Sequence, residues 1–501
     1  MKSWSAKERR SEEQEMEEQG TEQQGSSEAP ARISGNAITE GVIWKQLLLF
    51  FFPILFGTFF QQLYNTADAV IVGRFVGKEA LAAVGGSAAM IINLLVGFFV
   101  GLSSGATVII SQFYGAQKSK RISDAVHTAM AFSIVCGFGL MIVGILGSPM
   151  ALRLMGTPED TMTYSLVYMQ IYFLGIIPNL IYNMGAGILR AVGDSKRPLY
   201  YLIASCFTNI VLDFLFVVGL KMDVRGAALA TIISQYVSAV LVILNLMKTK
   251  ESYKLILKKI RMNLFMVKRI IQIGLPAGLQ SVMYAVSNII IQSSVNTLGT
   301  DTVAAYTAYS KIDSVYWMII SALGISITTF VGQNYGAGKL DRVKKGINVC
   351  LLLSVIITVL LSSALYMGGG YIYLLFTTDA DVIAIGMSIL YFMAPTFITY
   401  IFIEIYSGAL RGTGDCWIPM IITACGVCLL RILWIVIAVP FRPEITTIIF
   451  SYPLTWVTTS ILFIIYYYWF SSLKKYHVEF KRFSDWKRKR RQKRREKRLS
   501  Q

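Results

Sequence analysis

The chain consists mainly of long apolar stretches separated by short segments that contain glycine, proline or charged residues. A helix needs about 20 apolar residues to cross a hydrocarbon core of ~30 Å, and twelve such stretches can be recognised. Their approximate centres are Phe56, Ile92, Ile134, Leu174, Val211, Ile233, Met283, Ile319, Ile356, Ile398, Leu430 and Ile461. We therefore predict an all-α membrane protein with twelve transmembrane helices.

The two halves of the chain repeat one another. The segment Gln112-Phe-Tyr-Gly-Ala-Gln-Lys matches Gln333-Asn-Tyr-Gly-Ala-Gly-Lys, 221 residues later. At the same offset, Gly187-Ile-Leu-Arg-Ala-Val-Gly-Asp matches Gly408-Ala-Leu-Arg-Gly-Thr-Gly-Asp. Each copy holds an even number of spans, so both face the same way across the membrane. The predicted fold is two six-helix bundles, related by a pseudo-two-fold axis along the membrane normal, with a cleft between them.

We predict five parts along the chain. They are an acidic, disordered N-terminal segment (1–40), an N-lobe (41–248), a cytoplasmic linker (249–267), a C-lobe (268–471) and a basic cytoplasmic tail (472–501). The first segment holds nine acidic and five basic residues and too little apolar surface to order itself.

Charge sets the expected orientation. Only 15% of the residues are charged, and the connections after even-numbered helices hold nineteen Lys and Arg against six after odd-numbered ones. Basic loops stay inside, so both termini are expected in the cytoplasm, with the protein in the cell's inner (plasma) membrane. The tail, with its run Lys487 to Arg491, is expected to bind anionic lipid headgroups rather than nucleic acid. Arg190 and Arg411, near cytoplasmic helix ends, are expected to anchor those ends rather than to hold a gate closed.

The types of polar residue in the sequence argue against an enzyme. The chain has only two histidines, His127 and His477, so neither a histidine metal cluster nor a Ser/His/Asp relay is expected. No glycine-rich loop of the ATP-binding type occurs. We expect a monomeric transporter without a cofactor, driven by an ion gradient.

Two carboxylates in the first half are expected at membrane depth, where a charge is costly and commonly functional. They are Asp68 and Asp213; Asn209 lies one helical turn before Asp213, and Thr231 offers a hydroxyl on the next helix. These oxygen donors suit a small hard cation, while two neighbouring carboxylates could hold a proton instead. Alternatively, Asp213 pairs locally with Asn209 or backbone, and Thr231 only packs helices.

The second half carries a different polar set. Candidate cleft residues are Gln280, Tyr284, Asn288, Gln292, Lys311, Asp313, Tyr400 and Glu404, with Arg431 on the eleventh helix. The glutamines and Asn288 share one helix face, which either lines the cleft or serves contacts between helices. Either the opposite charges pair with each other, or Asp313 and Glu404 face the cleft and attract a cationic substrate.

Several motifs resemble those of the multidrug and toxic compound extrusion (MATE) family. In the first half they are Asn65-Thr-Ala-Asp-Ala-Val-Ile-Val-Gly and Leu81-Ala-Ala-Val-Gly. In the second half they are Gly274-Leu-Pro, Val303-Ala-Ala-Tyr and Val331-Gly-Gln-Asn-Tyr-Gly-Ala-Gly. The resemblance extends from Ile43 to Tyr468.

This resemblance implies cation-coupled export of organic, mostly cationic and amphipathic drugs, driven by inward flow of Na⁺ or H⁺. It also implies that Asp68, Asn209, Asp213 and Thr231 form the family's N-lobe cation site, with the first three as Na⁺ ligands if sodium is the coupling ion. One branch carries acidic residues where this chain has Tyr284 and Tyr400, so that branch's C-lobe coupling site is not implied.

The alternative function is that of a related flippase for lipid-linked or polysaccharide precursors. Such a protein usually holds pyrophosphate with cationic residues inside the cleft. The sequence places only Lys311 and Arg431 at that depth.

Overall fold

The computed structural model describes residues 37–471 and 473, and every regular element in this part of the chain is a helix. The first half contains α2 (Ala37–Glu40), α3 (Ile43–Phe75), α4 (Lys78–Gly85), α5 (Ser87–Gly115), α6 (Ser119–Leu154), α7 (Glu159–Leu174), α8 (Ile176–Ala191), α9 (Lys196–Asp213), the π-helical turn η1 (Phe214–Gly219) and α10 (Asp223–Lys248).

The second half follows a short 3₁₀ turn, η2 (Leu257–Lys259). It contains α11 (Leu264–Asn296), α12 (Thr300–Gly336), α13 (Leu340–Tyr373), α14 (Ala380–Thr413), α15 (Trp417–Thr423), η3 (Ala424–Leu429), α16 (Leu430–Phe441), α17 (Ile445–Ile465) and η4 (Tyr466–Phe470). Here η3 and η4 are also π-helical.

The prediction of a twelve-helix membrane protein is confirmed. Within the described residues, eleven continuous stretches are long and apolar enough to cross a membrane. The pair α7 and α8 supplies a twelfth if counted as one span, broken by a bend of 51° around Gly175. The predicted centre at Leu174 falls at this bend.

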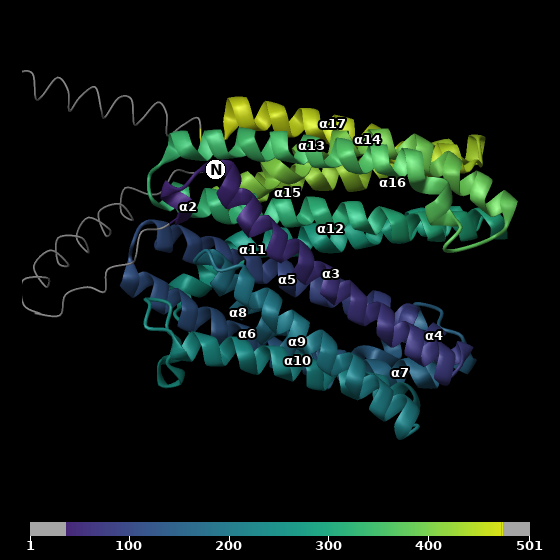
Figure 1. Cartoon of the computed structure of the whole chain (residues 1–501), viewed down its shortest axis with the longest axis horizontal. Helices are drawn as coiled ribbons and strands as arrows, with labels where there is room; N and C mark the ends of the chain where they lie inside the picture. Colours follow the sequence, from purple (N-terminus) through teal and green to yellow (C-terminus); the bar gives the residue numbers. More distant parts are fainter. Residues whose placement is uncertain (1–36, 472, 474–501) are drawn as a thin grey trace, which may run out of the picture. The chain divides into compact units, whose positions relative to one another are not determined.

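The helices gather into the two expected bundles (Figure 1). Helices α6 to α10 lie on one side and α12 to α17 on the other, with α5 and α11 between them. Helix α3 runs diagonally across, packing on α9 in the N-lobe and on α12 in the C-lobe. We use N-lobe for α3 to α10 and C-lobe for α11 to α17.

The predicted disordered segment and basic tail lie outside the described residues, apart from residues 37–40 and Leu473. Ala37–Glu40 forms α2 instead of being disordered. The Asn334 amide and the Arg342 guanidinium donate hydrogen bonds to the carbonyl of Ile38, and the Lys339 ammonium donates to that of Thr39. These cationic and amide donors hold α2 against the C-lobe.

Four glycines allow α5 and α11 to cross with their backbones in contact. Gly101 and Gly105 are four residues apart on α5, and Gly274 and Gly278 are four apart on α11. A Cβ on Gly101 would lie 2.6 Å from the Gly278 Cα, and one on Gly105 would lie 2.7 Å from the Gly274 nitrogen. Small residues at this spacing are a common device for close helix packing in membranes.

The symmetry-related crossing of α3 and α12 is looser. The positions 221 residues away from the α5 glycines are Ala322 and Ser326, and Pro53 takes the place of Gly274. These larger side chains keep α3 and α12 from approaching as closely as α5 and α11, which pack more extensively. The difference leaves room beside α12 for a cavity that also reaches Thr58 of α3.

Two repeat-related hydrogen bonds join the lobes where α5 and α12 end. The Gln112 amide donates to the Gly412 carbonyl at 2.9 Å, and the Gln333 amide donates to the Ala191 carbonyl at 2.7 Å. All four residues form pairs at the 221-residue offset, so the lobes exchange identical bonds. Each bond satisfies a carbonyl at a helix C-terminus that has no partner within its own helix. This exchange closes the end of the molecule that we predict to be cytoplasmic.

We expect Gln112→Ala and Gln333→Ala each to weaken this closure. Loss of one such hydrogen bond costs about 1 kcal/mol, or roughly a fivefold increase in opening. Hydrogen–deuterium exchange of the amides at 112–116 and 333–337 should accelerate by about that factor. Gln272→Ala, at an exposed position of α11, is the matched control. Unchanged exchange in a double variant that carries both Gln112→Ala and Gln333→Ala would contradict the role of this contact.

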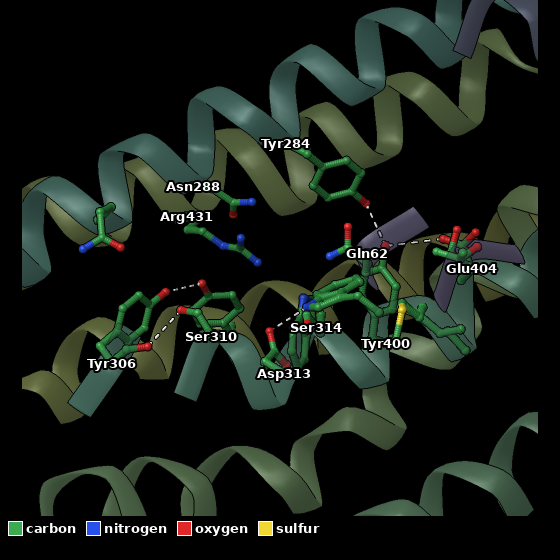
Figure 2. Close-up of a pocket in the computed structure, with 18 residues that line it drawn as sticks. Gln62, Tyr284, Asn288, Tyr306, Ser310, Asp313, Ser314, Tyr400, Glu404 and Arg431 are labelled. Carbon is green, nitrogen blue, oxygen red and sulfur yellow. Dashed lines mark hydrogen bonds between the residues drawn. The ribbon is translucent and has the colours of Figure 1, made fainter. Parts of the chain in front are cut away.

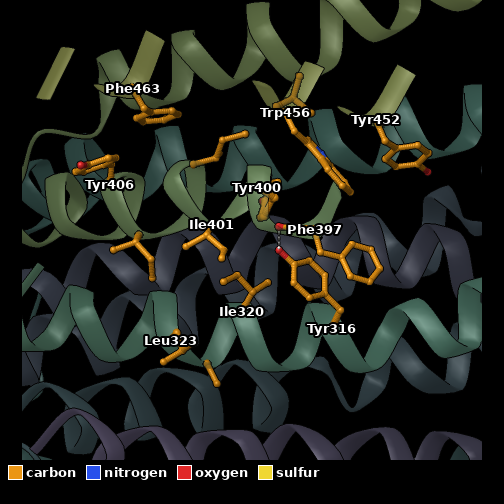
Figure 3. Packing of buried hydrophobic residues seen from close by; sticks show 14 of the residues in the cluster. Tyr316, Ile320, Leu323, Phe397, Tyr400, Ile401, Tyr406, Tyr452, Trp456 and Phe463 are labelled. Atoms are coloured by element: carbon orange, nitrogen blue, oxygen red, sulfur yellow. Dashed lines mark hydrogen bonds between the residues drawn. The ribbon is translucent and has the colours of Figure 1, made fainter. Parts of the chain in front are cut away.

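The C-lobe core is rich in stacked aromatic rings (Figure 3). Tyr316 of α12 stacks on Phe397 of α14 with ring centroids 4.2 Å apart and donates a hydrogen bond to the Phe397 carbonyl. Trp456 of α17 packs edge-on against Tyr400. This rigid aromatic layer fixes α12, α14 and α17 and carries the wall of the cavity described below.

Candidate functional site

The structure brings together the four predicted cation-site residues of the N-lobe. Asp68 of α3, Asn209 and Asp213 of α9, and Thr231 of α10 are all buried, with at most 4% of any of them exposed. The Thr231 hydroxyl donates a hydrogen bond of 3.1 Å to Asp68 Oδ2. The side chains of Asp213 and Asn209 also lie close enough to interact with the Asp68 carboxylate. Two acidic groups that are 145 positions apart in the chain therefore share one site.

The arrangement leaves oxygen atoms without protein donors. Asp68 Oδ1, both carboxylate oxygens of Asp213 and the Asn209 Oδ1 are buried and accept no hydrogen bond from the described residues. A buried carboxylate without partners is costly, and a small hard cation or a proton relieves both the desolvation and the repulsion. The donor set, with two carboxylates, an amide oxygen and a hydroxyl, fits either species.

Local backbone geometry contributes to the position of Asp213. Helix α9 changes to the π-helical turn η1 at the residue after Asp213. Such wide turns are rare and often occur at functional sites. In the C-lobe, η3 similarly ends two residues before Arg431. Neither turn is predicted from the sequence.

Sequence reasoning also missed a polar shell around the carboxylates. Tyr168 and Tyr172 of α7 lie near Asp68, and the Gln235 amide donates to the Tyr172 hydroxyl at 3.4 Å. Gln235 could have been recognised from the sequence as part of this shell, because it follows Thr231 by one helical turn and so shares its helix face.

A separate cavity of about 630 Å³ lies between α3 and the C-lobe (Figure 2). Aromatic side chains make much of its wall: Tyr284, Tyr306, Trp317, Tyr400, Tyr452 and Trp456. The hydroxyls of Tyr284 and Tyr400 meet at 3.2 Å. Thr58 and Gln62 complete the lining from α3. Flat aromatic walls with a few polar groups are typical of small-molecule sites.

Three charged side chains enter this cavity. Asp313 accepts hydrogen bonds from the Trp317 indole at 2.6 Å and from Tyr309 at 3.3 Å, and Glu404 accepts one from Tyr400 at 3.5 Å. Arg431 stacks over the Tyr452 ring, 4.3 Å from its centroid, and points into the cavity (Figure 2). None of the three forms an ion pair of 4 Å or less with another residue of the described part of the chain.

Most of the predicted cleft residues line this cavity, but two do not. Tyr284, Asn288, Gln292, Asp313, Tyr400 and Glu404 do so. Lys311 is exposed elsewhere on α12, because residues two apart on a helix point in different directions. Gln280 lies two turns before Asn288, donates to the Thr423 hydroxyl at 3.2 Å and lines the smaller cavity described next.

A second, smaller cavity of about 270 Å³ continues toward the closed end. Tyr284, Ser321 and Glu404 line both cavities. The second one also contains Arg190 and Arg411. The expectation that these arginines only anchor helix ends is therefore wrong, since their side chains turn inward between the lobes.

Comparison with known proteins agrees with this architecture. The family model described as MatE matches residues 53–215 and again residues 276–437. The probable multidrug resistance protein YoeA of Bacillus subtilis is 30% identical over 76% of this chain and 84% of its own length. The multidrug export protein MepA of Staphylococcus aureus is 24% identical over 74% of this chain and 82% of its own.

Solved structures show the same fold. An outward-facing multidrug resistance MATE family transporter superposes with a TM-score of 0.82 at 22% identity, over 89% of this chain and all of that one. A transporter from Pyrococcus furiosus gives a TM-score of 0.81 at 21% identity, over 87% of this chain and 98% of that one. The duplicated match and the likeness to YoeA over 76% of this chain establish that this multi-span membrane protein belongs to the MATE family of transporters.

Proposed function

We propose that this protein is an antiporter that exports small amphipathic organic compounds, mostly cations, in exchange for inward flow of Na⁺ or H⁺. The observation that carries the proposal is the buried group of Asp68, Asp213, Asn209 and Thr231 with its unsatisfied oxygens. A transporter that used only the substrate gradient would have no need to keep two adjoining carboxyl groups away from water.

In this proposal the cation site lies within the N-lobe, whereas the substrate cavity lies between α3 and the C-lobe. The cation is cargo rather than a resident cofactor. Binding of a cation or proton removes repulsion between Asp68 and Asp213, which changes how tightly α3 packs on α9 and α10. Because α3 also lines the substrate cavity through Thr58 and Gln62, this change reaches the substrate. Alternating access follows from rocking of the lobes about their interface.

The names of the relatives support drugs as the substrates, since YoeA and MepA are described as multidrug resistance and export proteins. The aromatic cavity wall suits flat cations, which bind to aromatic faces. Asp313 and Glu404 supply negative charge. We further propose that the protein acts as a monomer in the plasma membrane, with both termini in the cytoplasm.

The charge along the two cavities bears on the flippase alternative. Arg190 and Arg411 add to Arg431 as cationic residues there, although only Lys311 and Arg431 were expected at that depth. Asp313 and Glu404 offset two of these charges, which argues against a site for a pyrophosphate group.

Transport by purified protein in proteoliposomes tests the proposal. Ethidium uptake into vesicles of inside-out protein should require an imposed Na⁺ or pH gradient, and comparison of the two gradients identifies the coupling ion. Vesicles without protein are the control. Ethidium movement that is indifferent to both gradients, or absent, would refute the antiporter and leave the flippase as the better interpretation.

A further inference from the structure

The smaller cavity lies on the pseudo-two-fold axis. Its lining contains four pairs of residues at the 221-residue offset: Val100 and Ser321, Ser104 and Ile325, Thr107 and Thr328, and Arg190 and Arg411. Residues related by the axis can line one cavity only if that cavity lies on the axis. Arg190 and Arg411 therefore approach it from opposite lobes.

The charge around this cavity is not balanced by its own residues. Among the described residues, Glu404 is the one carboxylate in the lining, and the guanidinium groups of Arg190 and Arg411 also line the cavity. The repeat partner of Glu404 is Asn183, which is neutral and donates a hydrogen bond to the Asn179 carbonyl at 2.9 Å. The site thus has an excess of one positive charge.

The donors of the cavity are only partly used. Arg190 Nε is buried and has no acceptor among the described residues. The Thr329 hydroxyl is also buried, and it neither donates nor accepts a hydrogen bond within the described residues. The Ser104 and Thr107 hydroxyls bond only to backbone carbonyls of their own helix. Guanidinium groups bind carboxylates and phosphates with paired hydrogen bonds, so the charge of the ligand decides between the two.

We propose that this axial cavity binds the carboxylate of an amphipathic aromatic substrate whose ring system occupies the larger cavity. A singly charged carboxylate neutralises the excess charge, whereas a phosphate dianion would leave negative charge beside Glu404. The two cavities adjoin at Tyr284, Ser321 and Glu404, which line both, and in this proposal one molecule spans them. Arg411 follows Glu404 by seven residues, or about 10 Å along α14, so the junction and this guanidinium are within reach of one drug-sized molecule.

This inference rests on the proposed transport function and narrows its substrate class. It adds compounds that carry both a positive and a negative group to the mostly cationic compounds above. The positive group would lie near Asp313 in the larger cavity, and the carboxylate between the two arginines.

Two matched dyes test the site. Rhodamine 110 carries a free carboxylate, and rhodamine 123 is its methyl ester with the same ring system. Fluorescence polarisation with the purified full chain should show rhodamine 110 binding at least tenfold more tightly than rhodamine 123. The Arg190→Gln, Arg411→Gln double variant should lose this preference and bind rhodamine 123 within twofold of the unmodified protein, which also shows that the larger cavity is intact.

Two further variants complete the design. Arg190→Lys should keep part of the preference, because it keeps the charge but not the planar fork. Arg225→Gln, at an exposed position of α10, should leave binding of both dyes unchanged. Equal affinity for the two dyes, or a preference that survives in the double variant, would overturn the site. If ion-driven ethidium transport persists in that case, only this inference fails and the antiporter function remains.

Discussion

Asp68→Asn is expected to abolish ion-coupled export, with a fall of at least a hundredfold in gradient-driven ethidium transport. The amide keeps an oxygen for the hydrogen bond from Thr231 and has nearly the same volume, so folding is preserved. It removes the negative charge that holds the cation or proton next to Asp213. Without that charge, the N-lobe no longer binds the cation or proton whose inward flow drives export.

The measurement compares proteoliposomes of equal protein content under one gradient. Asp223→Asn is the matched control, because Asp223 is exposed and its left-handed backbone (φ 53°) is one that asparagine also adopts. The control should transport at the normal rate. Full gradient-driven export by Asp68→Asn would remove this carboxylate from the mechanism.

Gly115→Ala is expected to prevent the two lobes from closing where α5 meets α12. An added Cβ would overlap the Gln333 carbonyl oxygen, which belongs to the backbone and cannot rotate away. Gly336→Ala should act in the same way, since its Cβ would overlap the Gln112 carbonyl oxygen. Transport should fall at least tenfold in either variant, because one of the two alternating states can no longer form.

Spin labels at Lys120 and Asp341 can report this change directly, in a chain whose six native cysteines are replaced. Both positions are exposed and are related by the repeat. Their separation should increase in Gly115→Ala. Gly139→Ala is the control, because its Cβ would meet open space. An unchanged distance together with normal transport in Gly115→Ala would show that the lobes close elsewhere.

Much of the fold could be predicted from the sequence because its signals are local. Runs of apolar residues give the spans, and two short motifs at one offset give the duplication. The N-lobe carboxylates could also be recognised, since a charge within an apolar run is conspicuous. That Asp68 and Asp213 meet depends on the packing of α3 against α9, which only the structure shows.

What the sequence did not predict depends on side-chain direction and on backbone detail. Arg190 and Arg411 have the helix-end positions of interface anchors, yet they turn toward the axis. Lys311 and Asp313 are near neighbours in the chain, but only Asp313 reaches the cavity. The glycine spacing of α5 and α11 is visible in the sequence, but it indicates close packing of these helices only once they are known to cross. The π-helical turns have no recognised sequence signature.

The glutamine exchange between Gln112, Gly412, Gln333 and Ala191 bears on the origin of the chain. Each half carries both the donor glutamine and the accepting helix end, so two copies of one half-length ancestor could have made the same pair of bonds as a symmetric homodimer. Gene duplication and fusion would then have kept this closing contact between the two halves of the fused chain. The unequal carboxylates of the two halves would be later specialisations, free to diverge once the copies were no longer identical.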